Sequence, residues 1–134
     1  MRPLYLLGRA IFGGYFLYNG LNHFINREMM SQYAASKGVA ASDAAVVTSG
    51  AMLVAGGVSI LTGTQPRQGL AALVAFLLPV SLQMHRFWEE SDPQKRMAET
   101  VNFTKNMALL GGTLLAAAEP EPWPYSAGRH SAAA

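Results

Sequence analysis

The side chains of this sequence that could do chemistry are polar residues within or next to hydrophobic stretches. His23 and His85 could each carry a proton or hydrogen-bond the head group of a quinone-like molecule. Polar residues inside a membrane protein tend to face the interior of the helix bundle or a cavity, because exposing them to lipid is costly. The candidate binding residues are therefore the two histidines and six polar or aromatic neighbours: Asn19, Asn22, Arg86, Trp88, Lys105 and Asn106.

The residues give less support to a haem, metal, thiol or phosphate-binding site. Two histidines on different helices could ligate a haem or a metal, but no HxxE or ExxH pattern occurs. The chain has no cysteine, which excludes disulfides, thiolate metal sites and thiol redox chemistry. The paired glycines lack the strand-to-helix context of a phosphate-binding loop. We therefore expect no metal, and no catalytic residue can be assigned from a nucleophile–base–acid arrangement.

Four hydrophobic segments must position the candidates, at about residues 4–25, 43–63, 66–87 and 101–118. Of all residues 51% are hydrophobic and only 13% are charged. Ala44–Gly63 carries no charge, and as a helix it would span about 30 Å, the thickness of a bilayer core. A soluble helix of this length would show a charged face. The sequence thus predicts an all-α fold, an integral membrane four-helix bundle running up and down, rather than a soluble helical bundle.

Charge is concentrated in the link between the third and fourth segments. Seven of the eighteen charged residues fall between Arg86 and Thr100, which predicts a water-facing turn. Residues 28–36 could form a short interfacial helix. Glycines of the second segment should let neighbouring helices approach closely. These are Gly50, Gly56 and Gly57.

The chain divides into a transmembrane domain, residues 1–118, and a tail, residues 119–134. The tail alternates proline with polar residues, so we expect it to be extended or disordered. Arg9 should reach the interface or cap a helix-packing contact. The net charge is only +2, with no basic run interleaved with aromatic residues, so a nucleic acid is not an expected partner.

An up-and-down arrangement has a consequence for the candidate residues. The end of the first helix, the end of the third and the start of the fourth would meet at one membrane face. All eight candidates would gather there together with Gln83, around a polar pocket. The alternative is that they lie at the headgroup level only because interfaces attract Trp, Arg, Lys and His. Basic residues divide six to four between the two faces, which leaves the orientation open.

Three groups of residues carry a family resemblance, in one order along the segments. The first is Leu7-Gly8-Arg9 with Tyr18-Asn19-Gly20-Leu21, and the second is Gly57-Val58-Ser59-Ile60-Leu61-Thr62-Gly63 with Arg67. The third is His85-x-Phe87-Trp88, Asp92-Pro93 and Lys105-Asn106-Met107-Ala108-Leu109-Leu110-Gly111-Gly112. With these residues the chain resembles the DoxX family of small bacterial membrane proteins, over about residues 4–118.

The resemblance implies a multi-pass protein of the bacterial cytoplasmic (inner) membrane, in contact with the lipid bilayer and other membrane protein subunits. Relatives have been tied to thiosulfate:quinone oxidoreduction and to membrane oxidoreductase assemblies in oxidative-stress defence. It therefore implies a subunit or accessory component of a quinone-linked oxidoreductase, with quinone as the cofactor. In that role, Arg86 and Lys105 would provide a positive field for an anion such as thiosulfate.

The alternative is a non-catalytic structural subunit of a larger complex. Its loops and C-terminal tail, including Trp123-Pro124-Tyr125, would contact partners. One departure from the family favours this alternative. Many members have a glutamate four positions before the glycine that matches Gly57, where this chain has Leu53. The loss of that carboxylate argues against proton-coupled redox chemistry.

Overall fold

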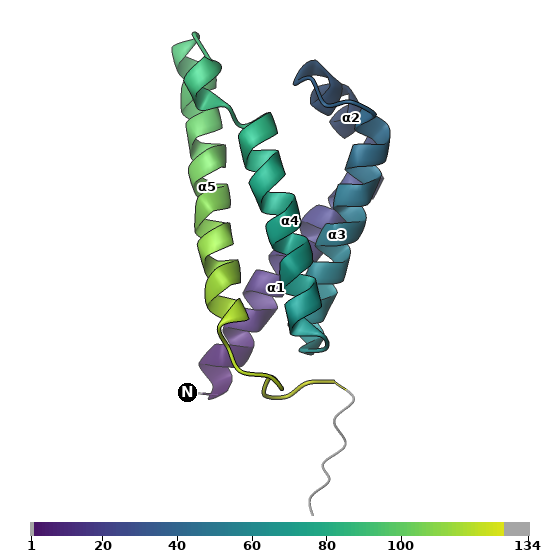
Figure 1. Cartoon of the computed structure of the whole chain (residues 1–134), viewed down its shortest axis with the longest axis vertical. Coiled ribbons are helices and arrows are strands. Elements are labelled where there is room, and N and C mark those ends of the chain that lie inside the picture. Colours follow the sequence, from purple (N-terminus) through teal and green to yellow (C-terminus); the bar gives the residue numbers. More distant parts are fainter. Residues whose placement is uncertain (1, 128–134) are drawn as a thin grey trace, which may run out of the picture.

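The computed structural model describes residues 2–127, and within them the chain is helical with no strand (Figure 1). The all-α prediction is confirmed. The elements are α1 (Arg2–Ile25), α2 (Arg27–Ser36), α3 (Ser42–Thr62), α4 (Pro66–Met84), the short 3₁₀ helix η1 (Phe87–Glu89) and α5 (Pro93–Ala117). Figure 1 shows α1 and α4 running upward, α3 and α5 running downward, and α2 at the upper end.

The helix boundaries agree with the sequence for the first three hydrophobic segments but not for the fourth. The short helix expected at residues 28–36 is present as α2. However, α5 begins at Pro93 rather than near residue 101, so the predicted turn over 86–100 is wrong in its second half. The Asp92 side chain accepts a hydrogen bond from the Lys95 amide at 2.9 Å, and Pro93 occupies the first helical turn. This is a strong start signal for a helix, and it outweighs the local charge.

Helices α1 and α3 are in backbone contact through glycines, as the sequence predicted for this type of residue. A Cβ atom on Gly57 would lie 2.6 Å from the backbone nitrogen of Leu17, and one on Gly20 would lie 2.7 Å from that of Val54. Such distances leave no room for any side chain. Figure 1 shows α1 crossing behind α3 and α4, and the glycines permit this close crossing.

Helix α4 packs on the other side of α3, with small residues again receiving larger ones. Leu73 fills the space beside Gly56, and Ser59 lies against Gly69. At the lower end of α3, Gly63 has a φ of 70°, a conformation that ends the helix and favours glycine. The buried core joins these elements; its members are Phe16, Leu53, Ile60, Leu70, Leu73, Leu77 and Trp123.

The lower end of the molecule is held by Arg9 of α1, which is buried. Its guanidinium donates to the carbonyls of Ile60 and Leu61 at 2.9 Å each, and to that of Pro124 at 2.6 Å. Arg9 therefore caps the end of α3, confirming the expected packing role. It also attaches the C-terminal residues 119–127 to the helices.

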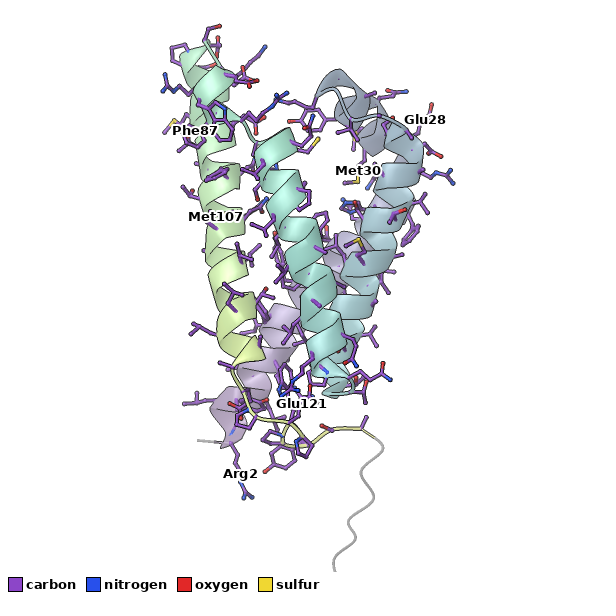
Figure 2. The ribbon with its side chains drawn as sticks, in the orientation of Figure 1. Arg2, Glu28, Met30, Phe87, Met107 and Glu121 are labelled. Atoms are coloured by element: carbon purple, nitrogen blue, oxygen red, sulfur yellow. The ribbon has the colours of Figure 1, made fainter. Side chains whose placement is uncertain are left out.

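These C-terminal residues pack on their own chain. Trp123 is only 2% exposed, and its ring meets that of Tyr5 edge to face. The amide of Ala127 donates to the carbonyl of Thr62 at 2.8 Å. Figure 2 shows Arg2 and Glu121 at this same end. The Trp123 ring, which the structural-subunit alternative places against a partner, is thus buried within this chain, and residues 128–134 of the tail lie outside the described part.

Two helical stretches within residues 2–127 are long and apolar enough to cross a membrane. They are Ser42–Thr62, with a mean hydropathy of 1.9, and Pro66–Glu89, with 1.5. Helices α1 and α5 are longer than α4, and they expose large apolar side chains. Ile11, Tyr18 and Ile25 of α1 and Val101 and Leu115 of α5 are each more than half exposed.

Candidate functional site

A cavity of about 630 Å³ is lined by residues of all five α-helices, toward the end of the molecule that carries α2 and η1. Its volume lies in the range of pockets that hold small organic molecules. In α4, Pro79 has no N–H to bond the carbonyl of Ala75, and both residues line the cavity. Most of the wall is apolar, with contributions from Phe16, Met29, Met30, Met52, Leu53, Phe76, Met84 and Leu109.

The polar end of the cavity is organised by Glu99, which is 7% exposed. One carboxylate oxygen, Oε2, lies 2.7 Å from Nδ1 of His85. The other, Oε1, accepts from the Tyr33 hydroxyl at 3.0 Å and from the Lys37 ammonium at 3.1 Å. Lys37 also pairs with Glu90 at 3.2 Å. The carboxylate thus joins α2, the α2–α3 link, the end of α4 and α5, and it is fully hydrogen-bonded despite its burial.

These hydrogen bonds determine which of the bonded groups around Glu99 are charged. The cluster they form lies N-terminal to the apolar part of α5. Burial alone would raise the pKa of Glu99, but hydrogen bonds from His85, Lys37 and Tyr33 outweigh it and leave that pKa below its ordinary value. Burial would lower the pKa of Lys37, but its bonds to Glu99 and Glu90 raise it overall. Burial and the bond to Glu99 both raise the pKa of Tyr33. At neutral pH the cluster therefore contains an ionised glutamate, a charged lysine and a neutral tyrosine.

The sequence places Glu99 here through the periodicity of α5. Glu99, Asn106 and Thr113 recur every seven residues, which is nearly two helical turns, and all three are buried. They lie on the face of α5 that packs toward the other helices. The charged residues next to Glu99 in sequence, such as Lys95 and Arg96, lie on other faces and are exposed.

Five of the eight residues singled out from the sequence line the cavity: Asn19, His23, His85, Lys105 and Asn106. The other three lie outside it. Asn22 accepts a hydrogen bond from the amide of Asn26 at 2.5 Å. Arg86 bonds Glu89 and the carbonyl of Lys37. Trp88 is 47% exposed and packs edge to face on Phe87 and Phe103.

Asn106 lines the cavity and is 6% exposed. No hydrogen bond joins its side-chain amide to the described residues. Its amide atoms keep some accessible surface, since the fully buried side-chain polar atom without a partner among the described residues is the Tyr5 hydroxyl. A ligand in the cavity would provide the missing partner of Asn106.

His23 and His85 each form a hydrogen bond through Nδ1 of the ring. Nδ1 of His23 lies 2.7 Å from the backbone carbonyl of Asn19, and Nδ1 of His85 faces Glu99. The His23 ring also meets Phe76 edge to face. Lys105 lies at the edge of the cavity, exposed to solvent, and its ammonium is 3.4 Å from Oδ1 of Asn102.

Sequence reasoning missed three polar residues of this region, Tyr33, Lys37 and Glu99, although it placed Gln83 at this face. The amide of Gln83 donates to the carbonyl of Lys37 at 2.9 Å, which holds the α2–α3 link against α4. Of these residues, only Glu99 could have been found from the local sequence, because its seven-residue spacing from Asn106 puts both on one face of a helix. Tyr33 and Lys37 come from α2 and the link after it, and the sequence does not show where these fold back.

Comparison with known proteins gives one family match. Residues 4–86, more than half of the chain, match the family model described as DoxX. The matched range begins at Leu4, near the start of α1, continues through α4 and ends at Arg86, so it includes His23 and His85 but not Glu99 or Asn106. No match was found among curated proteins or among solved structures.

Proposed function

Since the chain belongs to the DoxX family, we propose that it is a multi-pass protein of the bacterial cytoplasmic membrane that binds a quinone in the cavity. It would act there as a subunit or accessory component of a quinone-linked oxidoreductase assembly. The observation that carries the proposal is an apolar cavity with the hydrogen-bonded Glu99–His85 pair at its polar end.

The proposed membrane arrangement has α1, α3, α4 and α5 crossing in alternate directions, with α2 at one interface. Helices of 24 and 25 residues, α1 and α5, are long enough to cross a bilayer core of about 30 Å. Their exposed apolar side chains suit lipid contact. Arg9, the buried charged residue of α1, is bonded inside the protein, as lipid surroundings require, and Glu99 lies N-terminal to the apolar part of α5.

The residues of the cavity fit the two parts of a quinone. Methionine and aromatic side chains suit a flat ring and its apolar tail. The unpartnered Asn106 amide and the two histidines suit polar groups on the ring. When bound, the quinone supplies the redox-active group. The protein's residues hold it in place, exclude water and, through His85 and Glu99, provide a proton-carrying pair beside it.

Glu99 also provides a buried carboxylate, which the family's pattern leads one to expect at position 53, where this chain has Leu53. That leucine is 1% exposed and lies in the core, so no carboxylate is present at that position of α3. The buried carboxylate comes instead from α5. A proton-linked role for the cavity is therefore consistent with the chain's own residues, and this favours the oxidoreductase role over a purely structural one.

The test is quinone binding by the purified protein in lipid nanodiscs, using a decyl-substituted benzoquinone. Replacing Asn106 with leucine should fill the polar end and remove its donor, weakening binding by about tenfold or more. Asn22→Leu is the matched control, because Asn22 lies outside the cavity. Equal binding by both variants would exclude this cavity as the site.

A second experiment addresses the oxidoreductase role in native membranes. Replacing His85 and Lys105 together by alanine should slow quinone reduction by the membranes. Unchanged quinone reduction in the double variant would contradict the proposed oxidoreductase role and favour the structural-subunit alternative. Copurification in mild detergent would then show which proteins the chain assembles with.

A further inference from the structure

Helices α3 and α4 separate above a close contact, and the cavity begins where they separate. At that contact Leu73 of α4 lies against Gly56 of α3, where an added Cβ would be 2.5 Å from the leucine side chain. Within one turn above it, Met52 of α3 and Ala75 of α4 already line the cavity. Figure 1 shows the two helices meeting at their lower ends and diverging toward α2.

The cavity has an apolar rim on α4, formed by Ala75 and Pro79. These residues lie one turn apart on the same face of the helix, and both line the cavity and are exposed, so they mark an opening. At about 1.5 Å per residue, Ala75 lies about 14 Å along α4 from Pro66, the first residue of that helix. In the proposed membrane arrangement this is close to the middle of a bilayer core of about 30 Å. The opening would therefore face hydrocarbon rather than water.

The other exposed residues of the lining suit an apolar chain less well. Met29 and Tyr33 belong to α2, which we place at the membrane surface, and Tyr33 hydrogen-bonds Glu99 there. Lys105 of α5 carries an ammonium group. The rim on α4 is thus the part of the described lining that is exposed, uncharged and at the depth of the bilayer core.

We propose that the ligand of the cavity is a membrane-dissolved quinone with a long hydrocarbon chain, and that this chain passes out between α3 and α4, beside Ala75, into the lipid. The inference rests on the proposed function, and it adds the route of entry and the part of the ligand that stays in the bilayer. His85 directly follows α4 and lies about 15 Å from Ala75 along the helix axis, so the ring would lie at the polar end. A volume of about 630 Å³ suits a drug-sized molecule, and a longer chain must leave the cavity.

The rim should act on the chain by leaving its path open rather than by attracting it. Lipid chains are as apolar as alanine and proline side chains, so moving the tail from lipid to the rim changes its free energy little. A bulky side chain at the rim would obstruct the passage. It should therefore weaken the binding of ligands that carry a chain and spare those that do not.

The test measures binding of two ligands by the protein in lipid nanodiscs: a decyl-substituted benzoquinone, and the same ring without the decyl chain. Ala75→Trp should weaken binding of the decyl compound about tenfold or more and change binding of the tailless ring less than about twofold. Each ligand is compared between proteins, so its partition into the lipid cancels. Ala71→Trp is the matched control, because Ala71 is also exposed, lies one turn away on α4 and does not line the cavity. It should leave both affinities unchanged.

The possible outcomes separate the inference from the proposed function. If neither ligand binds the wild-type protein, both fail. If both ligands bind, and Ala75→Trp changes neither affinity or weakens both alike, the inference is overturned while the quinone site stands. An equal effect of Ala71→Trp on the decyl compound would also overturn it, because the effect would then be a general one of tryptophan on α4.

A second measurement uses the wild-type protein and does not depend on the tailless ring. A benzoquinone with a diazirine in the middle of its alkyl chain is irradiated with the protein in nanodiscs, and mass spectrometry identifies the labelled residues. We expect labelling of Met52, Ala75 or Pro79 that an excess of the decyl compound suppresses. Suppressible labelling confined to α2 or α5, or none at all, would overturn the inference.

Discussion

Glu99 and His85 come from different helices, and their side chains meet in a hydrogen bond of 2.7 Å at the polar end of a mostly apolar cavity. The contact makes the start of α5 part of the site, although that part of the chain is rich in charge. It also ties the integrity of the cavity to the protonation of one carboxylate. Stability and ligand binding should therefore respond together when this carboxylate is changed.

The first prediction concerns acid sensitivity. Because the pKa of Glu99 is lowered in the folded protein, its contribution to stability is complete above the ordinary glutamate pKa of about 4.3. That contribution is lost as the pH falls from there through the lower pKa of the folded state. Thermal unfolding in detergent between neutral and acid pH should show a smaller loss of stability for Glu99→Gln than for the wild type. Glu89→Gln, at an exposed position, should follow the wild type. Identical profiles for all three proteins would contradict the assigned role of Glu99.

The second prediction concerns the crossing of α1 and α3. Gly57→Ala would place a methyl group 2.6 Å from the backbone nitrogen of Leu17, so the helices must move apart. We expect a loss of about 1–3 kcal/mol in the free energy of unfolding, as is usual for overpacking. Gly14→Ala is the control, since a Cβ there meets nothing within 4 Å. It should be neutral or stabilising because alanine favours helix. Equal stability of the two variants would disprove the close crossing.

The third prediction concerns the C-terminal residues. Replacing Trp123, which is 2% exposed, with alanine would leave a cavity beside Tyr5 and Arg9. A loss of about 3–5 kcal/mol is expected for removing a buried tryptophan. Tyr125→Ala, at a residue 55% exposed, should cost much less. A thermal unfolding series on the two variants is sufficient, and a negligible effect at Trp123 would show that this segment is not part of the fold.

The fourth prediction concerns the membrane arrangement, which the absence of cysteine makes simple to test. Single cysteines at exposed Ser36 and Gln94 should react with a membrane-impermeant maleimide from one side only. Cysteines at exposed Thr64 and Glu119 should react from the other side. Labelling after detergent solubilisation controls for accessibility. Reaction of all four from the same side would rule out alternate crossing by the four long helices.

Helix positions could be predicted well where apolar stretches end in strong local signals, as with Pro66 at the start of α4 and Gly63 after α3. The start of α5 was misplaced because charge was taken to mean a loop. A charged stretch can still be helical when Asp92 and Pro93 begin it and one face carries the buried residues. For residues 93–100 the helix-start signals predicted a helix and the charge predicted a loop, and the helix-start signals were correct.

The cavity residues could be predicted only in part. An alternating topology shows which helix ends lie together, but it does not show how each helix is rotated about its own axis, and this rotation decides which side chains face the cavity. That explains why Asn19 and His23 line the cavity while Asn22, on the same helix, does not. Lys37 could not be found at all from local pattern. Its position depends on the α2–α3 link folding across to α5, a contact that joins residues 62 positions apart in the chain.

The three hydrogen bonds of Arg9 also have a meaning for how the protein is made. In the proposed membrane arrangement Arg9 enters the bilayer with the first helix, but its acceptors at Ile60 and Leu61 follow about fifty residues later, and Pro124 follows after 115. Chains are completed from the N-terminus, and early segments wait for later ones. During synthesis this guanidinium must therefore rely on water, lipid headgroups or the insertion machinery. It reaches its final surroundings only after Pro124 has been synthesised and released.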